Sequence, residues 1–517
     1  MVTRKHQHPT ITHLLFSGYI LGALLLITGV AMLLPVICAA IYSDEGDFPF
    51  LLITATSSIL TGYPLWKFCE RDRELGARDA FFIATAGWVI ISAISALPFV
   101  MSGAIPNFTD AFFEMMSGYT TTGATILVDI ESLPHGLKLW RSQTHFIGGM
   151  GFITLAVLLL PRGVGGVRLN RAETSPGQLV TGERFTARTK DAMVLLWGIY
   201  LVLNVLQIAL MCYAGLSFFD SICHTFATVA TAGYSTYNSS IGHFDSALVD
   251  WITITFMTLG GINFVLFIQL LRGNFTAFRI NTELRYYLLL LILVSLSVAA
   301  VLYASGTYLD DQSCIDDFRA EVPYQVCQPD IADSIRYGTF QVVSLLTTTG
   351  FTTADYALWP NAAQMMLWVV VFIGACAGST TSGVKIIHYI LIWRFMVAAV
   401  KKLFFQPLSV ISVRINEQRV NNRVVYLALC YFIANIFIIL LGSIVMAISD
   451  DLDIQSALST VISSLMNIGP GFGAIGPTET YYPLSDFGKW YLSFNMLIGR
   501  LEMFSALVLF YPSFWRD

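Results

Sequence analysis

Glycine recurs at four places in a chain that is otherwise strongly apolar, and at three of them it is joined by threonine. The four stretches read "SGYTTTGAT", "TAGYST", "LLTTTGFTTADY" and "NIGPGFG". The groups of these stretches that can bind a cation are neutral oxygens, from threonine hydroxyls and backbone carbonyls. The stretches provide no ring of carboxylates. Ca2+ and Mg2+ favour carboxylates, whereas rings of carbonyl oxygens replace the hydration shell of a monovalent cation. These residue types therefore indicate binding of an alkali cation, and glycine in all four copies favours potassium over sodium.

Each stretch carries a glycine directly after an apolar run that is long enough for about three helical turns. These glycines are Gly123, Gly233, Gly350 and Gly469. By subtraction they lie 110, 117 and 119 residues apart, so the unit is regular. In the fourth copy Gly471 competes for this place, and we choose Gly469 because it keeps Ser463 in register with Ser117. The spacing predicts four pseudo-equivalent segments around one axis.

Three residues of each copy are predicted to line this axis. Glycine permits the backbone angles that turn carbonyls inward, and helix C-termini aimed at the centre favour a cation. The threonine hydroxyls at positions 121, 231 and 348 are candidate further ligands. The predicted filter residues are Thr121, Thr122, Gly123, Thr231, Ala232, Gly233, Thr348, Thr349, Gly350, Asn467, Ile468 and Gly469. Close helix packing through small residues explains any single copy equally well, but four copies in register favour the filter.

The elements that position these segments are predicted to be membrane helices. Of the 517 residues, 55% are hydrophobic and only 12% are charged, whereas soluble domains average about 25% charged residues. Apolar stretches recur along the whole chain. They are Leu14–Tyr42, Phe48–Trp66, Ala80–Val100, Phe146–Leu160, Ala192–Ala214, Trp251–Leu271, Tyr286–Tyr303, Met366–Trp393, Val424–Ile448 and Lys489–Phe510. Extended backbone at membrane depth is tolerated only where it lines a wet path or binds something.

We therefore predict an all-α polytopic membrane protein with four pseudo-repeats around a central pore. Each repeat comprises a helix, a re-entrant pore helix, an extended filter strand and a second helix. Two peripheral transmembrane helices precede the first repeat. The predicted boundaries are 1–79 for the peripheral pair and 80–190, 191–285, 286–423 and 424–517 for the four repeats.

Charge is distributed unequally between the loops. The basic loops are Lys67–Arg78, Arg162–Lys190, Arg272–Arg285 and Arg394–Arg423. The acidic loops are Ser43–Asp47, Asp310–Glu321 and Ser449–Asp453. Because positive loops stay cytoplasmic, we expect both termini in the cytoplasm. Cys314 and Cys327 lie in or near the second acidic loop, and the sequence leaves open whether they form a disulfide.

A run of small residues, "GACAGSTTSG", interrupts the returning helix of the third copy. It is predicted to be a broken segment across the inner mouth, with close helix packing as the alternative. Arg500 lies in the last apolar stretch, where a charge usually faces a partner or a water-filled path. It is predicted to be an electrostatic barrier, the alternative being a structural pair with a backbone carbonyl or with an acid such as Glu502. The predicted gate residues are Gly374, Ala377, Gly378, Ser379, Thr380, Thr381, Gly383 and Arg500.

Three further polar residues lie in apolar surroundings. Glu114 either draws cations to the outer mouth or caps local backbone, and the sequence does not separate these roles. His145 and His224 lack the spacing of metal ligands, so we interpret them as hydrogen-bonded packing residues. No site for an organic cofactor is predicted, and potassium is the expected metal at the filter.

Several motifs together resemble the TrkH/TrkG branch of the Trk/Ktr/HKT superfamily of potassium transporters. They are "SGYTTTGAT", "GGMGFITLAVLLLP", "RAETSPG", "TAGYST", "LLTTTGFTTADY", "NIGPGFG" and "IGRLEMFSALVLF". The resemblance implies potassium uptake at the bacterial inner membrane by a homodimer with one pore per subunit. It also implies a cytosolic TrkA-like nucleotide-binding regulator and an intramembrane gating loop that meets Arg500. In relatives where serine replaces the first filter glycine, potassium selectivity is weaker, so Gly123 implies potassium.

Other classes of function fit the sequence less well. A secondary transporter with a midplane pocket usually shows inverted repeats, but proton- or sodium-coupled potassium symport remains open. An intramembrane enzyme needs a nucleophile and base or a metal cluster, and neither "HExxH" nor a convincing acid pair occurs. We therefore predict that the chain is not an enzyme.

Overall fold

The computed structural model describes residues 9–43, 46–69, 77–151, 189–305, 330–404, 413–416 and 418–514. Cys314, Cys327 and almost all of the basic loop Arg162–Lys190 lie outside these ranges, so the predictions about them stay predictions. Within the described ranges, six helices are long and apolar enough to cross a membrane. A seventh span is counted if two helices joined at a 91° bend form one. The predicted polytopic helical architecture is confirmed.

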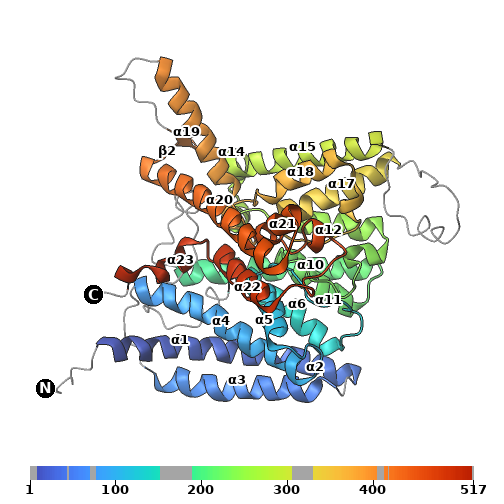
Figure 1. Ribbon diagram of the computed structural model, residues 1–517, viewed down its shortest axis with the longest axis vertical. Helices are drawn as coiled ribbons and strands as arrows, with labels where there is room; N and C mark the ends of the chain where they lie inside the picture. The colour runs from blue at the N-terminus through green and yellow to red at the C-terminus, as the bar shows by residue number, and fades with distance from the viewer. Residues whose placement is uncertain are drawn as a thin grey trace.

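Two spans precede the repeats. The first consists of α1 (Pro9–Ala31) and α2 (Leu33–Tyr42), and the second is α3 (Phe48–Phe68), which packs along α1. Small residues allow this close approach: a Cβ added at Gly22 would lie 2.6 Å from the backbone nitrogen of Trp66. The pair forms one edge of the molecule, at the bottom of Figure 1.

The four repeats follow with the predicted order of elements. Their first helices are α4 (Ala77–Met101), α10 (Thr189–Tyr213), α15 (Thr282–Ser305) and α20 (Asn422–Asp450). Their pore helices are α5 (Phe108–Tyr119), α11 (Phe218–Val229), α17 (Ile331–Leu346) and α21 (Ile454–Met466). Their returning helices are α6 (His135–Gly149), α12 (Ala247–Gly260), α18 (Asn361–Val371) and α22 (Asp486–Arg500). The pore helices have 12 to 16 residues, too few to cross a bilayer.

Three of the pore helices begin at a side-chain cap. Asn107 accepts a hydrogen bond from the backbone of Thr109, and Ser217 accepts one from Asp220. Asp453 accepts one from Gln455. Such caps satisfy backbone donors that have no partner inside the helix. The caps define where these three pore helices start, and the glycine turns define where all four end.

Consecutive repeats pack in a closed cycle. The returning helix of each repeat contacts the pore helix of the next one: α6 contacts α11, α12 contacts α17, and α18 contacts α21. The cycle closes because α22 of the fourth repeat contacts α5 of the first. Figure 1 shows these helices gathered in the middle of the molecule, between α1 and α3 on one side and α15 on the other.

Three predicted spans are broken in the structure, and one of them, Trp251–Leu271, is broken at the 91° bend. Between α18 and α19 (Ile386–Phe404), residues 372–385 form no helix, as expected for the small-residue run. The prediction of one span over Lys489–Phe510 is wrong, because α22 ends at Arg500. Glu502 and Met503 both have φ of 52°, which a right-handed helix does not allow. The short α23 (Phe504–Leu507) follows the break.

The remaining elements are short. They are α13 (Phe264–Leu271), α14 (Phe275–Ile280), the 3-10 helices Ser240–Phe244, Tyr356–Leu358, Gly473–Ile475, Val508–Phe510 and Pro512–Phe514, and the strands β1 (Arg414–Ile415) and β2 (Gln418–Arg419). The two strands pair antiparallel. α12 and α13 are the helices that meet at the 91° bend, where the chain passes Gly260 and Gly261.

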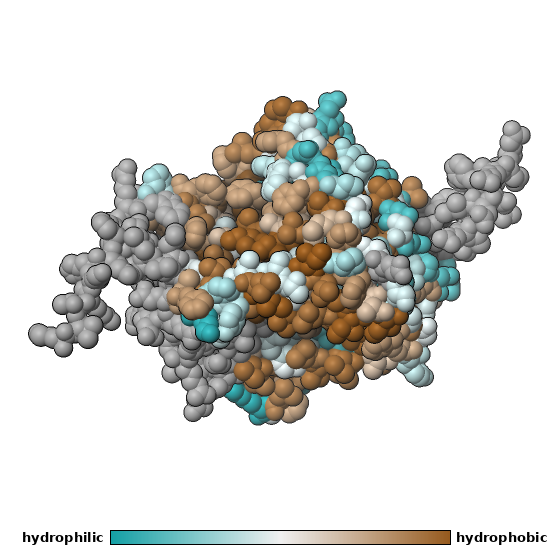
Figure 2. Space-filling model, turned by 90° about the horizontal axis from the view of Figure 1, so that it is seen from below, coloured by the Kyte–Doolittle hydropathy of each residue, from teal (hydrophilic) through white to brown (hydrophobic). Residues whose placement is uncertain are grey.

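The outer surface of the helix bundle is apolar and its interior is rich in polar groups. Leu60, Val205 and Ile444 are 72%, 65% and 56% exposed, whereas many threonines and serines at the centre are fully buried. Figure 2 shows a face on which hydrophobic residues predominate, with hydrophilic residues mainly toward the top and right edges of the view. This distribution is expected of a bundle that faces lipid and encloses a polar path.

Candidate functional site

The four pore helices end in the same backbone turn. At the end of each helix, one residue has a left-handed backbone conformation: φ is 54° at Thr121, 53° at Thr231, 52° at Thr348 and 54° at Asn467. Two residues later, φ is 78°, 89°, 82° and 97° at the four predicted glycines. Left-handed angles are uncommon for β-branched residues such as threonine. Their recurrence at three equivalent threonines shows that the surrounding structure imposes the turn.

One backbone hydrogen bond recurs in each turn. Thr122 donates its N–H to the carbonyl of Ser117, five residues earlier, at 2.9 Å. The equivalent donors in the other copies are Ala232, Thr349 and Ile468, at 2.8, 2.8 and 3.0 Å. This is the bond that closes a helix whose next residue is left-handed. The fourth copy therefore has Gly469, not Gly471, in the equivalent place, as the register with Ser463 predicts.

The four turns form a closed ring. A Cβ added at Gly123 would lie 2.1 Å from the carbonyl oxygen of Ala232 in the next repeat. The equivalent distances are 2.1 Å from Gly233 to Thr349, 2.0 Å from Gly350 to Ile468 and 2.6 Å from Gly469 back to Thr122. Main chain thus faces main chain at all four junctions. No residue larger than glycine fits at any of them without moving the neighbouring segment.

The carbonyl oxygens of this ring are almost all without a protein donor. Within the described part of the chain, only one of the twelve predicted filter residues, Gly469, has a carbonyl that accepts a hydrogen bond. Its donors are the hydroxyls of Ser463 at 2.5 Å and Tyr481 at 2.7 Å. Buried carbonyls normally have a partner. The structure therefore brings the predicted filter residues together around oxygens that are available to a cation.

The loop 372–385 lies against two of the threonines of this ring. The hydroxyl of Thr380 donates to the carbonyls of Val229 and Gly260, at 3.0 and 3.1 Å. The backbone N–H of Ser382 donates to the hydroxyl of Thr348 at 3.0 Å. The hydroxyl of Thr231 donates to that of Thr380 at 3.2 Å. Two of the three threonine hydroxyls proposed as ion ligands are therefore engaged by the loop.

Arg500 joins three repeats below the filter. Its Nη1 donates to the carbonyl of Thr380 at 3.0 Å and to the hydroxyl of Ser382 at 3.2 Å. Its Nη2 donates to the carbonyls of Gly148 and Gly149, at 2.5 and 3.2 Å. The guanidinium thus ties the loop of the third repeat to the end of α6 in the first. The alternative of a structural contact with backbone carbonyls is what these bonds show, and the electrostatic barrier stays a prediction.

Two charged residues that sequence reasoning missed also hold the loop. Glu283, which is 2% exposed at the start of α15, accepts the N–H of Ala377 at 2.7 Å. Lys385, which is 4% exposed, donates to the carbonyl and hydroxyl of Thr381 and to the carbonyl of Ser382. A signal for Lys385 was present, because a lysine between the small-residue run and an apolar helix is unusual. Glu283 lay in a basic loop and gave no signal.

Glu114, His145 and His224 lie outside the ring of filter residues. Glu114 is fully buried and accepts the N–H of Ile126, so it supports local backbone. His224 bonds the carbonyl of Asp220 and the hydroxyl of Ser235, as a packing residue should. His145 stacks on Tyr234, with ring centroids 4.0 Å apart. The prediction that His145 is hydrogen-bonded is wrong, because neither ring nitrogen has a partner among the described residues.

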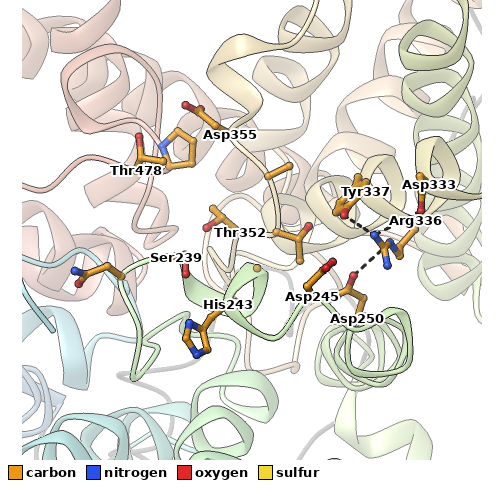
Figure 3. Close-up of a pocket in the computed structure, with 15 residues that line it drawn as sticks. Ser239, His243, Asp245, Asp250, Asp333, Arg336, Tyr337, Thr352, Asp355 and Thr478 are labelled. Atoms are coloured by element: carbon orange, nitrogen blue, oxygen red, sulfur yellow. Dashed lines mark hydrogen bonds and ion pairs between the residues drawn. The ribbon is translucent and has the colours of Figure 1, made fainter. Parts of the chain in front are cut away.

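On the side of the ring away from the loop, two cavities share a wall. The smaller one, of about 100 Å3, is lined by all four filter glycines. The larger one, of about 420 Å3, is drawn in Figure 3. Asp245 and Asp250 lie next to each other in it, and Arg336 pairs with Asp250 at 3.6 Å and with Asp333 at 3.5 Å. Asn238, Thr352, Pro477 and Thr478 line both cavities. Excess negative charge next to the mouth favours the approach of cations.

Comparison with known proteins identifies the family. Residues 48–516 match the model of the TrkH family, described as a cation transport protein. The chain belongs to the TrkH family. Its relatives include the Trk system potassium uptake protein TrkH of Escherichia coli K12, 35% identical over 503 residues, which are 96% of this chain and 98% of that protein. TrkG of the same strain is 30% identical over 514 residues, or 98% and 99% of the two chains.

A solved structure supports the TrkH fold over the whole chain. The crystal structure of the potassium transporter TrkH from Vibrio parahaemolyticus matches with a TM-score of 0.82 and 30% identity, covering 97% of this chain and all of that one. The family resemblance read from the motifs and the predicted fold class are therefore confirmed. Because the TrkH family consists of cation transporters, the prediction that this chain is not an enzyme is confirmed as well.

Proposed function

We propose that this TrkH-family chain takes up potassium across the bacterial inner membrane through the ring of filter residues. The observation that carries the proposal is the closed cycle of four glycine turns. Carbonyl oxygens without protein donors surround it, and such oxygens take the place of water around an alkali cation. The relatives named as potassium uptake proteins support potassium as that cation.

We propose further that loop 372–385 and Arg500 form a closed gate. The loop contacts the threonines at the inner end of two filter segments, and Arg500 adds a positive charge below them. A cation that leaves the ring inward meets both obstacles. Moving the loop away from Thr348 removes the first, and breaking its bonds to Arg500 releases the second.

The gate is proposed to open when a cytosolic TrkA-like nucleotide-binding regulator binds, and two chains are proposed to form a homodimer with one pore each. The start of α1 and the short α23 lie at the same end of the bundle (Figure 1), which supports both termini on one side of the membrane. The basic loops support the cytoplasm as that side.

The experiment is uptake of radioactive rubidium into liposomes that contain the purified chain, with potassium, sodium or lithium as competitors. Strong inhibition by potassium but not by lithium is the expected result. Equal inhibition by all three ions contradicts a selective ring. A pH-sensitive dye inside the liposomes tests for coupling in the same assay: acidification in step with rubidium entry identifies proton symport.

A further inference from the structure

The pore helices carry a buried polar residue nine positions before each filter glycine. These residues are Glu114, His224, Gln341 and Thr460, and all four are fully buried. His224 and Gln341 make neutral hydrogen bonds to Ser235 and Thr353, and Thr460 bonds the carbonyl of Ser456 in its own helix. The first repeat differs because it places a carboxylate at this position.

Glu114 holds the first filter segment directly beyond its glycine. One carboxylate oxygen accepts the N–H of Ile126 at 2.9 Å, and the other accepts the hydroxyl of Thr125 at 3.0 Å. The second oxygen also accepts the Nε–H of Arg141 at 2.6 Å. A carboxylate with three donors in a buried site is held in one position.

Arg141 extends this contact to the second filter segment. Its Nη1 donates to the carbonyl of Ser235 at 2.8 Å, two residues beyond Gly233. Its guanidinium carbon lies 3.5 Å from the ring centroid of Tyr234, whose hydroxyl donates back to the carbonyl of Glu114 at 2.7 Å. Arg141 is 2% exposed and lines the cavity at the filter mouth. The pair therefore connects two adjacent sides of the ring through charged groups.

We propose that Glu114 and Arg141 are positioning residues that keep the first two filter segments at a fixed separation and so set the preference for potassium over sodium. The inference rests on the proposed function. Sodium is the smaller ion, and a ring whose segments move inward closes around it. The hydrogen bonds of Glu114 to Thr125 and Ile126 hold the first segment to the buried ion pair, and the bond from Arg141 to Ser235 holds the second, so these charge-assisted bonds resist that movement.

A second buried ion pair on the same helix serves as a control. Asp110, one turn before Glu114, pairs with Lys489 at 2.6 Å and is 7% exposed, with Lys489 at 4%. This pair joins α5 to α22. Among the described residues, neither Asp110 nor Lys489 forms a hydrogen bond with a filter segment. Its loss removes a comparable buried charge pair without releasing the ring.

The test compares Glu114→Gln, Arg141→Lys and Asp110→Asn in full-length protein reconstituted into liposomes. Glutamine keeps the size of Glu114 but leaves the Arg141 charge without its counter-ion. Lysine keeps the charge of Arg141 but cannot reach Glu114 and Ser235 together with one ammonium group. The readout is the ratio of the sodium and potassium concentrations that halve rubidium uptake. The thermal unfolding midpoint of each variant reports its fold.

We expect the ratio of the sodium and potassium concentrations to fall about tenfold in Glu114→Gln and in Arg141→Lys, an effect within the range of interaction energies measured for residues in contact. In Asp110→Asn the ratio should change by less than about twofold. If Glu114 and Arg141 have only a structural role, the unfolding midpoint falls in all three variants and the ratio stays unchanged. Folded variants of Glu114 and Arg141 with the wild-type ratio overturn the proposal, as does an equal loss in Asp110→Asn. If Glu114→Gln does not fold, Arg141→Lys decides by the same ratio. A wild-type protein without any preference overturns the proposed function instead.

Discussion

The filter ring and the loop beneath it are stabilised in opposite ways. The ring consists of four copies of one backbone turn, and its junctions place main-chain atoms of one repeat against main-chain atoms of the next. Among the described residues such a loop is seen in the third repeat. It is held by side chains such as Glu283 and Arg500 and by a few backbone hydrogen bonds to the second repeat. The close main-chain packing of the ring leaves little freedom, whereas hydrogen bonds can be exchanged, and this difference supports the proposal of a rigid ring and a movable loop.

The energies are consistent with this division. A neutral hydrogen bond contributes about 1 kcal/mol net, and one to a charged group about 1.5–3 kcal/mol. Shifting a two-state equilibrium from 1:99 to 99:1 requires about 5.5 kcal/mol of differential binding. By the same figures the four hydrogen bonds of Arg500 alone amount to about 6–12 kcal/mol. A regulatory partner therefore moves the loop by replacing part of these bonds with its own.

The largest effect is expected from a methyl group in the ring. Gly233→Ala places a Cβ about 2.1 Å from the carbonyl of Thr349 at a φ of 89°, so the segment must shift. We expect rubidium uptake to fall by about 100-fold, the usual cost of a displacement near 1 Å at a positioned site. Gly198→Ala is the matched control, because nothing lies within 4 Å of the added atom. Normal uptake by Gly233→Ala would show that the ring is not rigid.

A smaller effect of opposite sign is expected at Arg500. Arg500→Ala removes four hydrogen bonds that tie the loop to the first repeat, together with the charge below the filter. Rubidium uptake without any partner protein should rise by at least about tenfold, since a single hydrogen bond of a charged group contributes about 1.5–3 kcal/mol. Arg423→Ala, at an exposed position at the start of α20, is the control. Uptake at or below the wild-type rate would contradict the gate.

The smallest effect is expected from a single hydroxyl of the loop. Thr380→Val keeps the shape of the side chain but removes its bonds to the carbonyls of Val229 and Gly260. Uptake without a partner should rise by about fivefold, since one neutral bond contributes about 1 kcal/mol. Thr255→Val removes an exposed hydroxyl bonded within its own helix and should leave uptake unchanged. If Thr380→Val has no effect while Arg500→Ala does, the charge and not the loop restricts the ion.

The same contrast explains how much of the site was predictable from the sequence. Each filter turn is local: the bond from Thr122 to Ser117 spans five residues, so a repeated pattern of residues is enough to locate it. The contacts of Arg500 are not local, since its partners Gly148 and Gly149 lie about 350 positions away in the chain. Their carbonyls are identical to every other carbonyl in the sequence, and only the fold distinguishes them.

The last helix illustrates a further limit. An apolar run from Lys489 to Phe510 predicts one span, but tertiary contacts end the helix at Arg500. A Cβ at Gly499 would lie 2.0 Å from the carbonyl of Leu465 in the neighbouring pore helix, so α22 passes close to the filter support here. A hydropathy profile does not reveal this close approach of two helices. The contact of Glu114 with Arg141 was equally unpredictable from the sequence, because Arg141 lies in a different helix.

The central claim is that carbonyl oxygens of four equivalent turns bind a bare alkali ion at the centre of the ring. The most direct measurement is anomalous X-ray diffraction from crystals of the protein grown in rubidium. The account predicts an anomalous peak on the axis, coordinated by the carbonyls of Thr122, Ala232, Thr349 and Ile468. Rubidium that binds elsewhere in the protein, with no peak inside the ring, would contradict it.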